Sequence, residues 1–178
     1  MVKCSNESVP GEIIAVDETM VPFRRRLLFR QYIPSKRHRY GIKLFKLCDP
    51  KGYTYRMSIY TGQNFENVSN VKELAEKIVL NLAQDYLNNG RTVITDNFYT
   101  SVPLAKSLLD SKTHLLGTLR KNRRDLPKEV MNDNLKKGEI IGKESSVGII
   151  VAKWRDKRDV SFLSTKHDLE IKAIGKRN

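Results

Sequence analysis

Two aspartates that each follow a short apolar run are the residues best suited to chemistry in this sequence. Asp17 follows the run 13–16, and Asp96 follows the run 92–95. A carboxylate at the end of a buried strand is held rigidly while it still faces solvent, as a metal ligand must be. Two such carboxylates can hold the divalent ions of a phosphoryl-transfer site. An aspartate at a strand end is also common as a turn or helix-cap residue, so the spacing alone leaves both roles open.

The segments around these aspartates predict alternating strands and helices. Strands are expected over residues 12–17, 40–47, 53–60, 92–95 and 114–119. The turn signal at 49–52 predicts that the second and third of these strands form a hairpin. Apolar residues recur at helical spacing over 71–87, and a second helix is expected to begin at a Ser101 cap. This order predicts an α/β layered fold whose sheet is antiparallel at first and parallel later.

The composition is strongly basic. The chain of 178 residues has 33 Lys and Arg against 20 Asp and Glu, which gives a net charge of +13. This excess favours polyanionic partners, above all nucleic acid, over a merely solubilising charge or an anionic membrane surface. No apolar run approaches the roughly 20 residues that span a bilayer, so no membrane segment is expected. Two cysteines without a CxxC pair argue against a zinc site or a disulfide framework, and favour the cytosol or nucleus.

The positive charge is concentrated in two clusters. One follows Asp17 closely, and the other follows the strand after Asp96, so both could flank one active face and neutralise phosphates. The alternative is that each cluster is a solvated surface. The candidate DNA-binding residues are Arg24, Arg26, Lys36, Arg39, Lys43, Arg120, Lys121, Arg123 and Arg124. The run 120–124 also fits a nuclear-import patch, which is a weak pattern.

After residue 124 the character of the chain changes. A polar stretch leads to short candidate strands at 139–141, 146–154 and 160–164. This change predicts two parts, a layered domain over residues 1–124 and a β-rich domain over residues 125–178.

Several motifs in one order resemble the piggyBac family of DNA transposases and their domesticated relatives. The motifs are VDETM at 16–20, QYIPSK at 31–36, YGIK at 40–43, IYTG at 59–62, TDNFYTS at 95–101, GTLRKNR at 117–123 and VSFLST at 160–165. Together they extend over nearly the whole chain. The resemblance implies that Asp17 and Asp96 are the first two catalytic aspartates of the family.

The resemblance also implies a fold and an activity. The fold is an α/β, RNase H-like mixed sheet with flanking helices, incomplete at its C-terminus and followed by the start of a β-rich insertion. Asp17 and Asp96 would bind Mg²⁺ or Mn²⁺, and the substrates would be transposon ends and TTAA target sites in nuclear DNA. Two ions about 3.5–4 Å apart would stabilise both the attacking and the leaving oxygen. No covalent protein intermediate is needed, which agrees with a sequence that has no Ser/His or Cys/His arrangement.

The sequence departs from the family in one respect that bears on activity. The third aspartate, expected in a Gly-Gly-Val-Asp-like context, has no counterpart here. Three hypotheses therefore stay open. They are a transposase fragment with impaired cleavage, a domesticated non-catalytic DNA- or chromatin-binding protein, and a nuclease that recruits a third carboxylate from a partner chain.

The same departure bears on stability, because the final core helix is expected to be missing as well. Part of a sheet face would then meet water, at a cost of about 25 cal/mol per Å² of apolar surface. This predicts either low stability for the chain alone or a homodimer formed through the open face.

Overall fold

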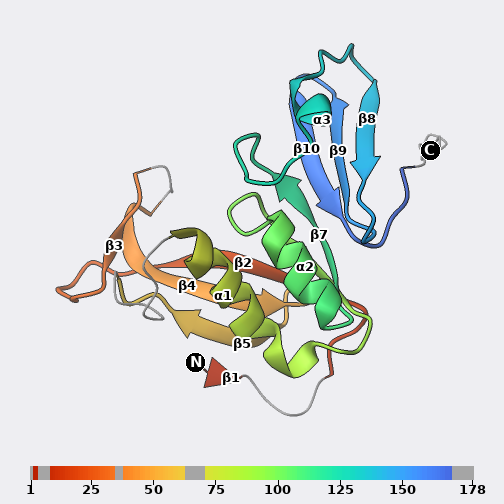
Figure 1. Ribbon diagram of the computed structural model, residues 1–178. Helices are drawn as coiled ribbons and strands as arrows, with labels where there is room; N and C mark the ends of the chain where they lie inside the picture. Colours follow the sequence, from red (N-terminus) through yellow and green to blue (C-terminus); the bar gives the residue numbers. More distant parts are fainter. Residues whose placement is uncertain (1, 4–8, 35–37, 63–70, 170–178) are drawn as a thin grey trace, which may run out of the picture.

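The computed structural model describes residues 2–3, 9–34, 38–62 and 71–169. Within these residues, ten strands form one mixed sheet, and helices pack against it (Figure 1). The strands are β1 (Val2–Lys3), β2 (Ile13–Pro22), β3 (Gln31–Tyr32), β4 (Tyr40–Cys48), β5 (Thr54–Ile59), β6 (Thr92–Thr95), β7 (His114–Leu119), β8 (Ile140–Glu144), β9 (Ile150–Arg155) and β10 (Asp159–Ser164). The helices are α1 (Val71–Ala83), the short 3₁₀-helix η2 (Gln84–Tyr86), α2 (Val102–Asp110) and α3 (Lys128–Asn132).

The strand order is β1-β5-β4-β2-β6-β7-β10-β9-β8, and β3 pairs with β4 outside this path. Strands β5, β4 and β2 are antiparallel neighbours, whereas β2, β6 and β7 are parallel. Parallel neighbours need a crossover connection, and α1 and α2 supply the two crossovers. This arrangement confirms the predicted α/β fold with an RNase H-like mixed sheet and flanking helices.

Helices α1 and α2 cover one face of the sheet and build the core there. Their apolar side chains, among them Leu82 and Leu104, are fully buried, as are Ile14 and Val16 of β2 beneath them. Helix α2 begins as predicted, because Ser101 Oγ accepts the Leu104 N–H at 3.3 Å. The predicted helix over 71–87 is wrong at its end: α1 stops at Ala83, and only a 3₁₀ turn follows.

The hairpin of β4 and β5 has its turn where the sequence signal predicts it. Asp49 Oδ1 accepts the N–H groups of Lys51 and Tyr53, each at 2.9 Å. Gly52 adopts a φ of 91°, which is accessible to glycine and strained for other residues. Local side-chain chemistry therefore closes this hairpin.

Strands β8, β9 and β10 continue the sheet at its far edge. β10 pairs antiparallel with β7, with Ser161 opposite Leu119 and Ser164 opposite Leu116. In Figure 1 these three strands form the blue part at the upper right, with α3 beside them. The predicted strand over 146–154 starts four residues later than expected, at Ile150, because the preceding residues form the turn from β8. The proposed boundary at residue 124 falls in the connection between β7 and α3.

The sheet face opposite α1 and α2 carries partly exposed apolar side chains. Ile13, Val21, Ile59 and Trp154 are between 41% and 43% exposed. None of the helices within the described residues is long and apolar enough to cross a membrane.

Candidate metal and nucleic-acid site

Asp17 and Asp96 lie on neighbouring parallel strands at the same level. Val16 of β2 is the register partner of Thr95 of β6, and the two aspartates are the next residues along each strand. Both aspartates are exposed, whereas Val16 and Thr95 are buried. The fold thus places at one level of neighbouring strands two aspartates that are far apart in the chain.

The expectation that a strand ends at Asp17 is wrong. β2 continues to Pro22 because β4 pairs with it throughout, from Ala15 opposite Cys48 to Pro22 opposite Gly41. β6, which pairs with the other edge of β2, does end at this level, immediately before Asp96. Asp17 is therefore held by a continuous strand, and Asp96 by a turn.

Each carboxylate uses one oxygen to accept a nearby backbone N–H. Asp17 Oδ1 accepts the Glu18 N–H at 2.7 Å, and Asp96 Oδ1 accepts the Phe98 N–H at 2.9 Å. The carbonyl of Asp96 accepts the Thr100 N–H at 3.1 Å and the Thr100 hydroxyl at 2.8 Å. These bonds fix the turn that carries Asp96 while its carboxylate faces solvent.

The buried Tyr99 reports the negative charge at this edge. Burial raises the pKa of its hydroxyl far above the usual range, and the charges of Glu18, Asp96 and Asp17 raise it further. The charges of Asp17, Glu18 and Asp96 therefore all act on this one buried hydroxyl.

The carboxylates of Asp17 and Asp96 could supply some of the ligands that a hard divalent cation needs. Carboxylate oxygens are the ligands that Mg²⁺ prefers, and Mg²⁺ usually keeps several waters beside one or two carboxylates. Within the described residues, no group of three or more His, Cys, Asp or Glu side chains could hold a metal ion. Asp17 and Asp96 could therefore supply two ligands, and the remainder would come from water or substrate oxygens.

Lys46 lies directly opposite Asp17, on β4. Register partners on antiparallel strands project to the same face, so a half-buried cation accompanies the carboxylate there. The sequence places Lys46 in the basic cluster that follows Asp17, and only the register of β2 and β4 reveals that it lies opposite this carboxylate.

Lys43, a predicted DNA-binding residue, lies largely inside the molecule. Its ammonium is 3.0 Å from Glu18 Oε2, and its side chain is 16% exposed. The ammonium also lies 5.0 Å and 5.2 Å from the ring centroids of Phe45 and Phe98. The Lys43 ammonium therefore interacts with groups inside the protein and is not directed at solvent, where a phosphate would bind.

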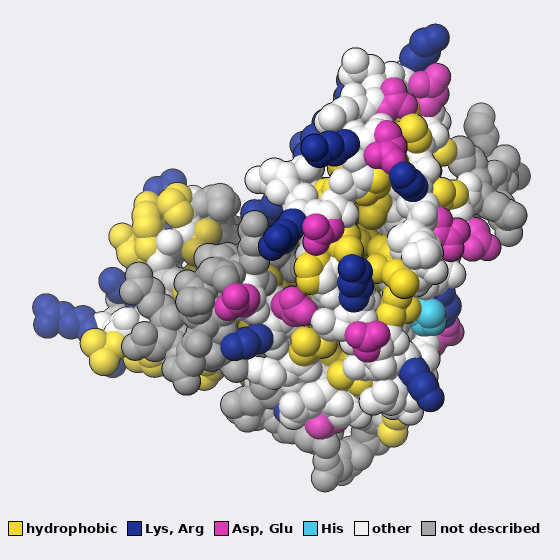
Figure 2. All heavy atoms as spheres, in the orientation of Figure 1, with side chains coloured by type: hydrophobic (Ala, Val, Ile, Leu, Met, Phe, Trp, Pro, Cys, Tyr) yellow, Lys and Arg dark blue, Asp and Glu magenta, His cyan; other side chains and the backbone are white. Residues whose placement is uncertain are grey.

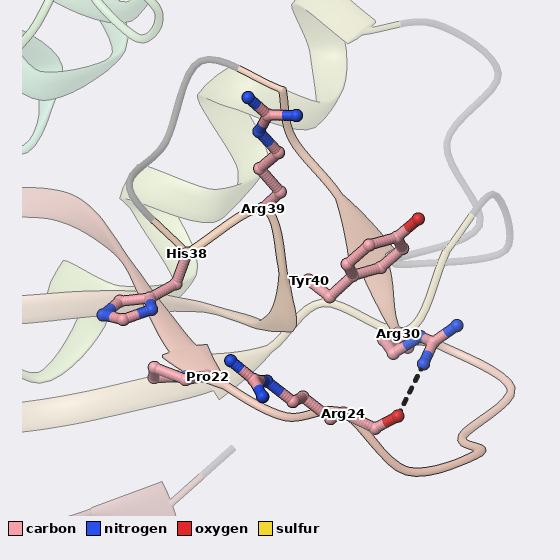
Figure 3. Close-up of a pocket in the computed structure, with 6 residues that line it drawn as sticks. All are labelled: Pro22, Arg24, Arg30, His38, Arg39 and Tyr40. Atoms are coloured by element: carbon pink, nitrogen blue, oxygen red, sulfur yellow. Dashed lines mark hydrogen bonds between the residues drawn. The ribbon is translucent and has the colours of Figure 1, made fainter.

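The other predicted cations of the first cluster lie around the loop between β2 and β4. Arg24, Arg26 and Arg39 are exposed, and Lys36 lies outside the described residues. A cavity of about 320 Å³ is lined by Pro22, Arg24, Arg30, His38, Arg39 and Tyr40 (Figure 3). Arg30 supports this cavity, since its guanidinium donates to the Arg24 carbonyl at 2.9 Å and lies 4.9 Å from the Tyr40 ring centroid.

The second cluster divides into two kinds of cation. Arg120 and Arg123 contact the turn that follows Asp96, whereas Arg124 is 84% exposed. Lys121 forms an ion pair with Asp159 at 2.8 Å. The hydrogen bonds of Lys121 and Arg155 lower the pKa of Asp159 to about 2.

The surface view shows where charged and apolar side chains gather. In Figure 2, Lys and Arg mark the tip of the loop at the far left, which Figure 1 places between β2 and β4. Hydrophobic side chains gather between α2 and the upper strands. A hollow of about 500 Å³ lies there, lined by apolar residues such as Val102 and Leu126 together with charges of both signs. This mixed lining suits neither a metal ion nor a phosphate.

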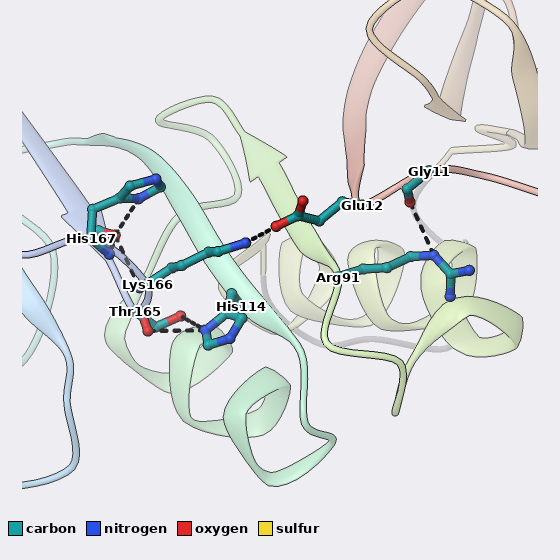
Figure 4. Close-up of polar contacts among 8 residues, drawn as sticks. Gly11, Glu12, Arg91, His114, Thr165, Lys166 and His167 are labelled. Atoms are coloured by element: carbon teal, nitrogen blue, oxygen red, sulfur yellow. Dashed lines mark hydrogen bonds and ion pairs between the residues drawn. The ribbon is translucent and has the colours of Figure 1, made fainter.

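A separate polar network lies at the opposite ends of the parallel strands (Figure 4). Lys166 pairs with Glu12, and Arg91 Nε donates to the Gly11 carbonyl at 3.1 Å. His114 Nδ1 lies 3.0 Å from the Thr165 carbonyl. These contacts tie the end of β10 to the beginnings of β2, β6 and β7, and thus have a structural role away from the two aspartates.

Comparison with known proteins assigns the class to which this fold and site belong. A family model described as Transposase IS4 matches residues 2–178. The chain therefore belongs to this transposase family.

Individual relatives place the chain among piggyBac-type proteins. It is 26% identical over 164 residues to the human PiggyBac transposable element-derived protein 3, and equally to the human Chimeric ERCC6-PGBD3 protein. The match covers 88% of this chain but only 28% and 16% of the two human proteins. A piggyBac transposase solved in a synaptic complex with hairpin DNA is 31% identical and superposes with a TM-score of 0.84, over 92% of this chain and 35% of that one. The piggyBac resemblance expected from the sequence motifs is confirmed.

Proposed function

We propose that this chain acts on DNA as part of a piggyBac-type transposase, and that Asp17 and Asp96 bind Mg²⁺ or Mn²⁺. The observation that supports the proposal is the register of β2 and β6, in which the residues immediately before the two exposed aspartates, Val16 and Thr95, are partners. Their oxygens are suitable ligands, and a bound ion would supply Lewis-acid stabilisation of the oxygens at a phosphoryl group. The proposed substrates are transposon ends and TTAA target sites, and the proposed location is the nucleus.

The basic surfaces support DNA as the ligand. The net charge is +13, and exposed arginines lie in the loop that follows β2, the strand that carries Asp17. The similar piggyBac transposase was solved with hairpin DNA. We assign phosphate contacts first to Arg24, Arg26 and Arg39, whose guanidinium groups are exposed, and next to Arg124 and the undescribed Lys36.

A second candidate function is a non-catalytic DNA- or chromatin-binding role. Lys46 beside Asp17 favours it, because a resident cation opposes the binding of a second one. A third acidic ligand is also lacking within the described residues. A homodimer that supplies a carboxylate from its second copy would restore catalysis and is the remaining alternative.

Metal binding is tested by titrating the purified chain with Mn²⁺ and following free Mn²⁺ by electron paramagnetic resonance. Asp17→Asn and Asp96→Asn are each expected to weaken binding at least tenfold, since each removes one of two charged ligands. Asp110→Asn, at the exposed end of α2, is the matched control and should leave binding unchanged. Equal binding by the wild type and both Asn variants would overturn the metal site.

DNA binding is tested separately, by fluorescence anisotropy with a DNA hairpin over a salt series. The logarithm of affinity should fall linearly with the logarithm of salt, and Arg24→Met with Arg39→Met should reduce the slope by about 1.8. Cleavage that requires Mn²⁺ and disappears in Asp96→Asn would identify a catalytic protein. Binding without cleavage would favour the non-catalytic role, and absence of salt-dependent binding would overturn both.

A further inference from the structure

The turn that follows Asp96 is held from a distant part of the chain. Arg123, in the connection after β7, donates from Nη2 to the carbonyl of Asn97 at 2.9 Å and also to the carbonyl of Phe98. Arg120 adds a bond from Nε to the side-chain oxygen of Asn97 at 3.0 Å. Two cations of the second basic cluster are therefore directed at protein oxygens next to the metal-site candidate.

One peptide unit connects Arg123 to the carboxylate of Asp96. The Asn97 carbonyl that accepts from Arg123 belongs to the same planar peptide as the Phe98 N–H. That N–H donates to Asp96 Oδ1 at 2.9 Å. Because the group is planar, a cation that fixes the direction of its C=O also fixes the direction of its N–H. The guanidinium charge also polarises the peptide, which strengthens the bond to the carboxylate.

The environment of Arg123 fits a role inside the protein. Its side chain is half-buried, and within the described residues its Nε is buried without a hydrogen-bond partner. Burial lowers the pKa of the guanidinium, the neighbouring charge of Arg120 lowers it further, and Asp96 opposes both. A cation in such surroundings needs the two carbonyl oxygens, and this use of its donors leaves it poorly placed for a phosphate.

We propose that Arg123 is a positioning residue for Asp96, acting through the peptide between Asn97 and Phe98 to hold the carboxylate in the orientation that a metal ion requires. This inference rests on the proposed metal site and assigns Arg123 a role other than the phosphate contact that its position in a basic cluster predicts. Arg124, the next residue, carries the same charge but is exposed and has no contact with the turn within the described residues. It is therefore the matched control.

The first experiment compares Arg123→Met with Arg124→Met in Mn²⁺ and DNA titrations. Loss of a residue that orients a metal ligand typically lowers metal affinity by 10- to 100-fold, so Arg123→Met should weaken Mn²⁺ binding at least tenfold. Arg124→Met should leave Mn²⁺ binding unchanged and reduce the salt slope of DNA binding by about 0.9. The proposal is overturned if Arg123→Met binds Mn²⁺ as the wild type does and instead shows a weaker salt dependence of DNA binding.

The second experiment needs no metal and separates this inference from the proposed function. Amide hydrogen exchange of Phe98, measured by NMR in the metal-free protein, should be faster in Arg123→Met than in the wild type by at least tenfold. Arg123→Lys, which retains one cationic donor, should give an intermediate rate and guards against a Met variant that fails to fold. Unchanged Phe98 exchange in a folded variant overturns the positioning role. If Phe98 exchange is faster in Arg123→Met but the wild type binds no Mn²⁺, the positioning role stands and the proposed metal site is overturned.

Discussion

Replacing Lys46 with methionine should make the site bind a divalent cation more tightly. Lys46 is the register partner of Asp17, and side chains in such pairs have Cβ atoms about 5 Å apart. For an ion on the Asp17 carboxylate, we take a distance of about 6 Å to the ammonium group, which is of the same order as this Cβ separation. The repulsion between charges of +2 and +1 at about 6 Å is about 1.4 kcal/mol at the dielectric constant of water. The half-buried position of Lys46 makes this value a lower bound.

The expected result is therefore a Mn²⁺ affinity at least tenfold higher in Lys46→Met, measured by electron paramagnetic resonance or calorimetry. Methionine is unbranched and only one atom shorter than lysine, so packing against β2 and β5 should change little. Lys77→Met, on the exposed side of α1, changes the net charge equally at a distance and should have no such effect. An affinity that is unchanged or lower in Lys46→Met would refute the reasoning, because the ammonium group would then not repel the ion.

Two further predictions concern stability. Gly117→Ala should destabilise the protein by about 1–3 kcal/mol in urea titrations, because its Cβ would lie 2.2 Å from Thr100 Oγ1. Gly11→Ala, with open space around the new Cβ, is the control and should not differ from the wild type by more than about 0.5 kcal/mol. The pKa of Asp159 is lowered to about 2, so its contribution to stability is present above about pH 4 and is lost as the pH falls through 2. Asp159→Asn should therefore be less stable than the wild type at pH 5 and nearly equal to it near pH 2, and an equal gap at both pH values, or a similar change in the control Asp156→Asn, would contradict this.

The strands and crossover helices could be predicted from the sequence because their signals are local. Apolar runs, a helical period and the Asp49 turn act within a few residues, and they correctly imply a sheet that is antiparallel at first and parallel later. The extension of β2 beyond Asp17 could not be predicted, because it depends on pairing with β4. The same limit explains Lys43, whose ion pair with Glu18 follows from that pairing, and Arg123, whose partners lie far from it in the chain.

Two cations with opposite effects define what this site can do. Arg123 holds the Asp96 turn before any ion binds, which reduces the cost of ordering a ligand, whereas Lys46 adds repulsion once an ion arrives. A chain with both Arg123 and Lys46 in these positions would have an ordered site with reduced affinity for the proposed ion. If Lys46→Met raises Mn²⁺ affinity and Mn²⁺-dependent cleavage appears with it, the transposase chemistry is intact and is held back by one charge. If affinity rises without cleavage, repulsion by Lys46 is excluded as the cause of the missing activity. The missing element is then a further metal ligand.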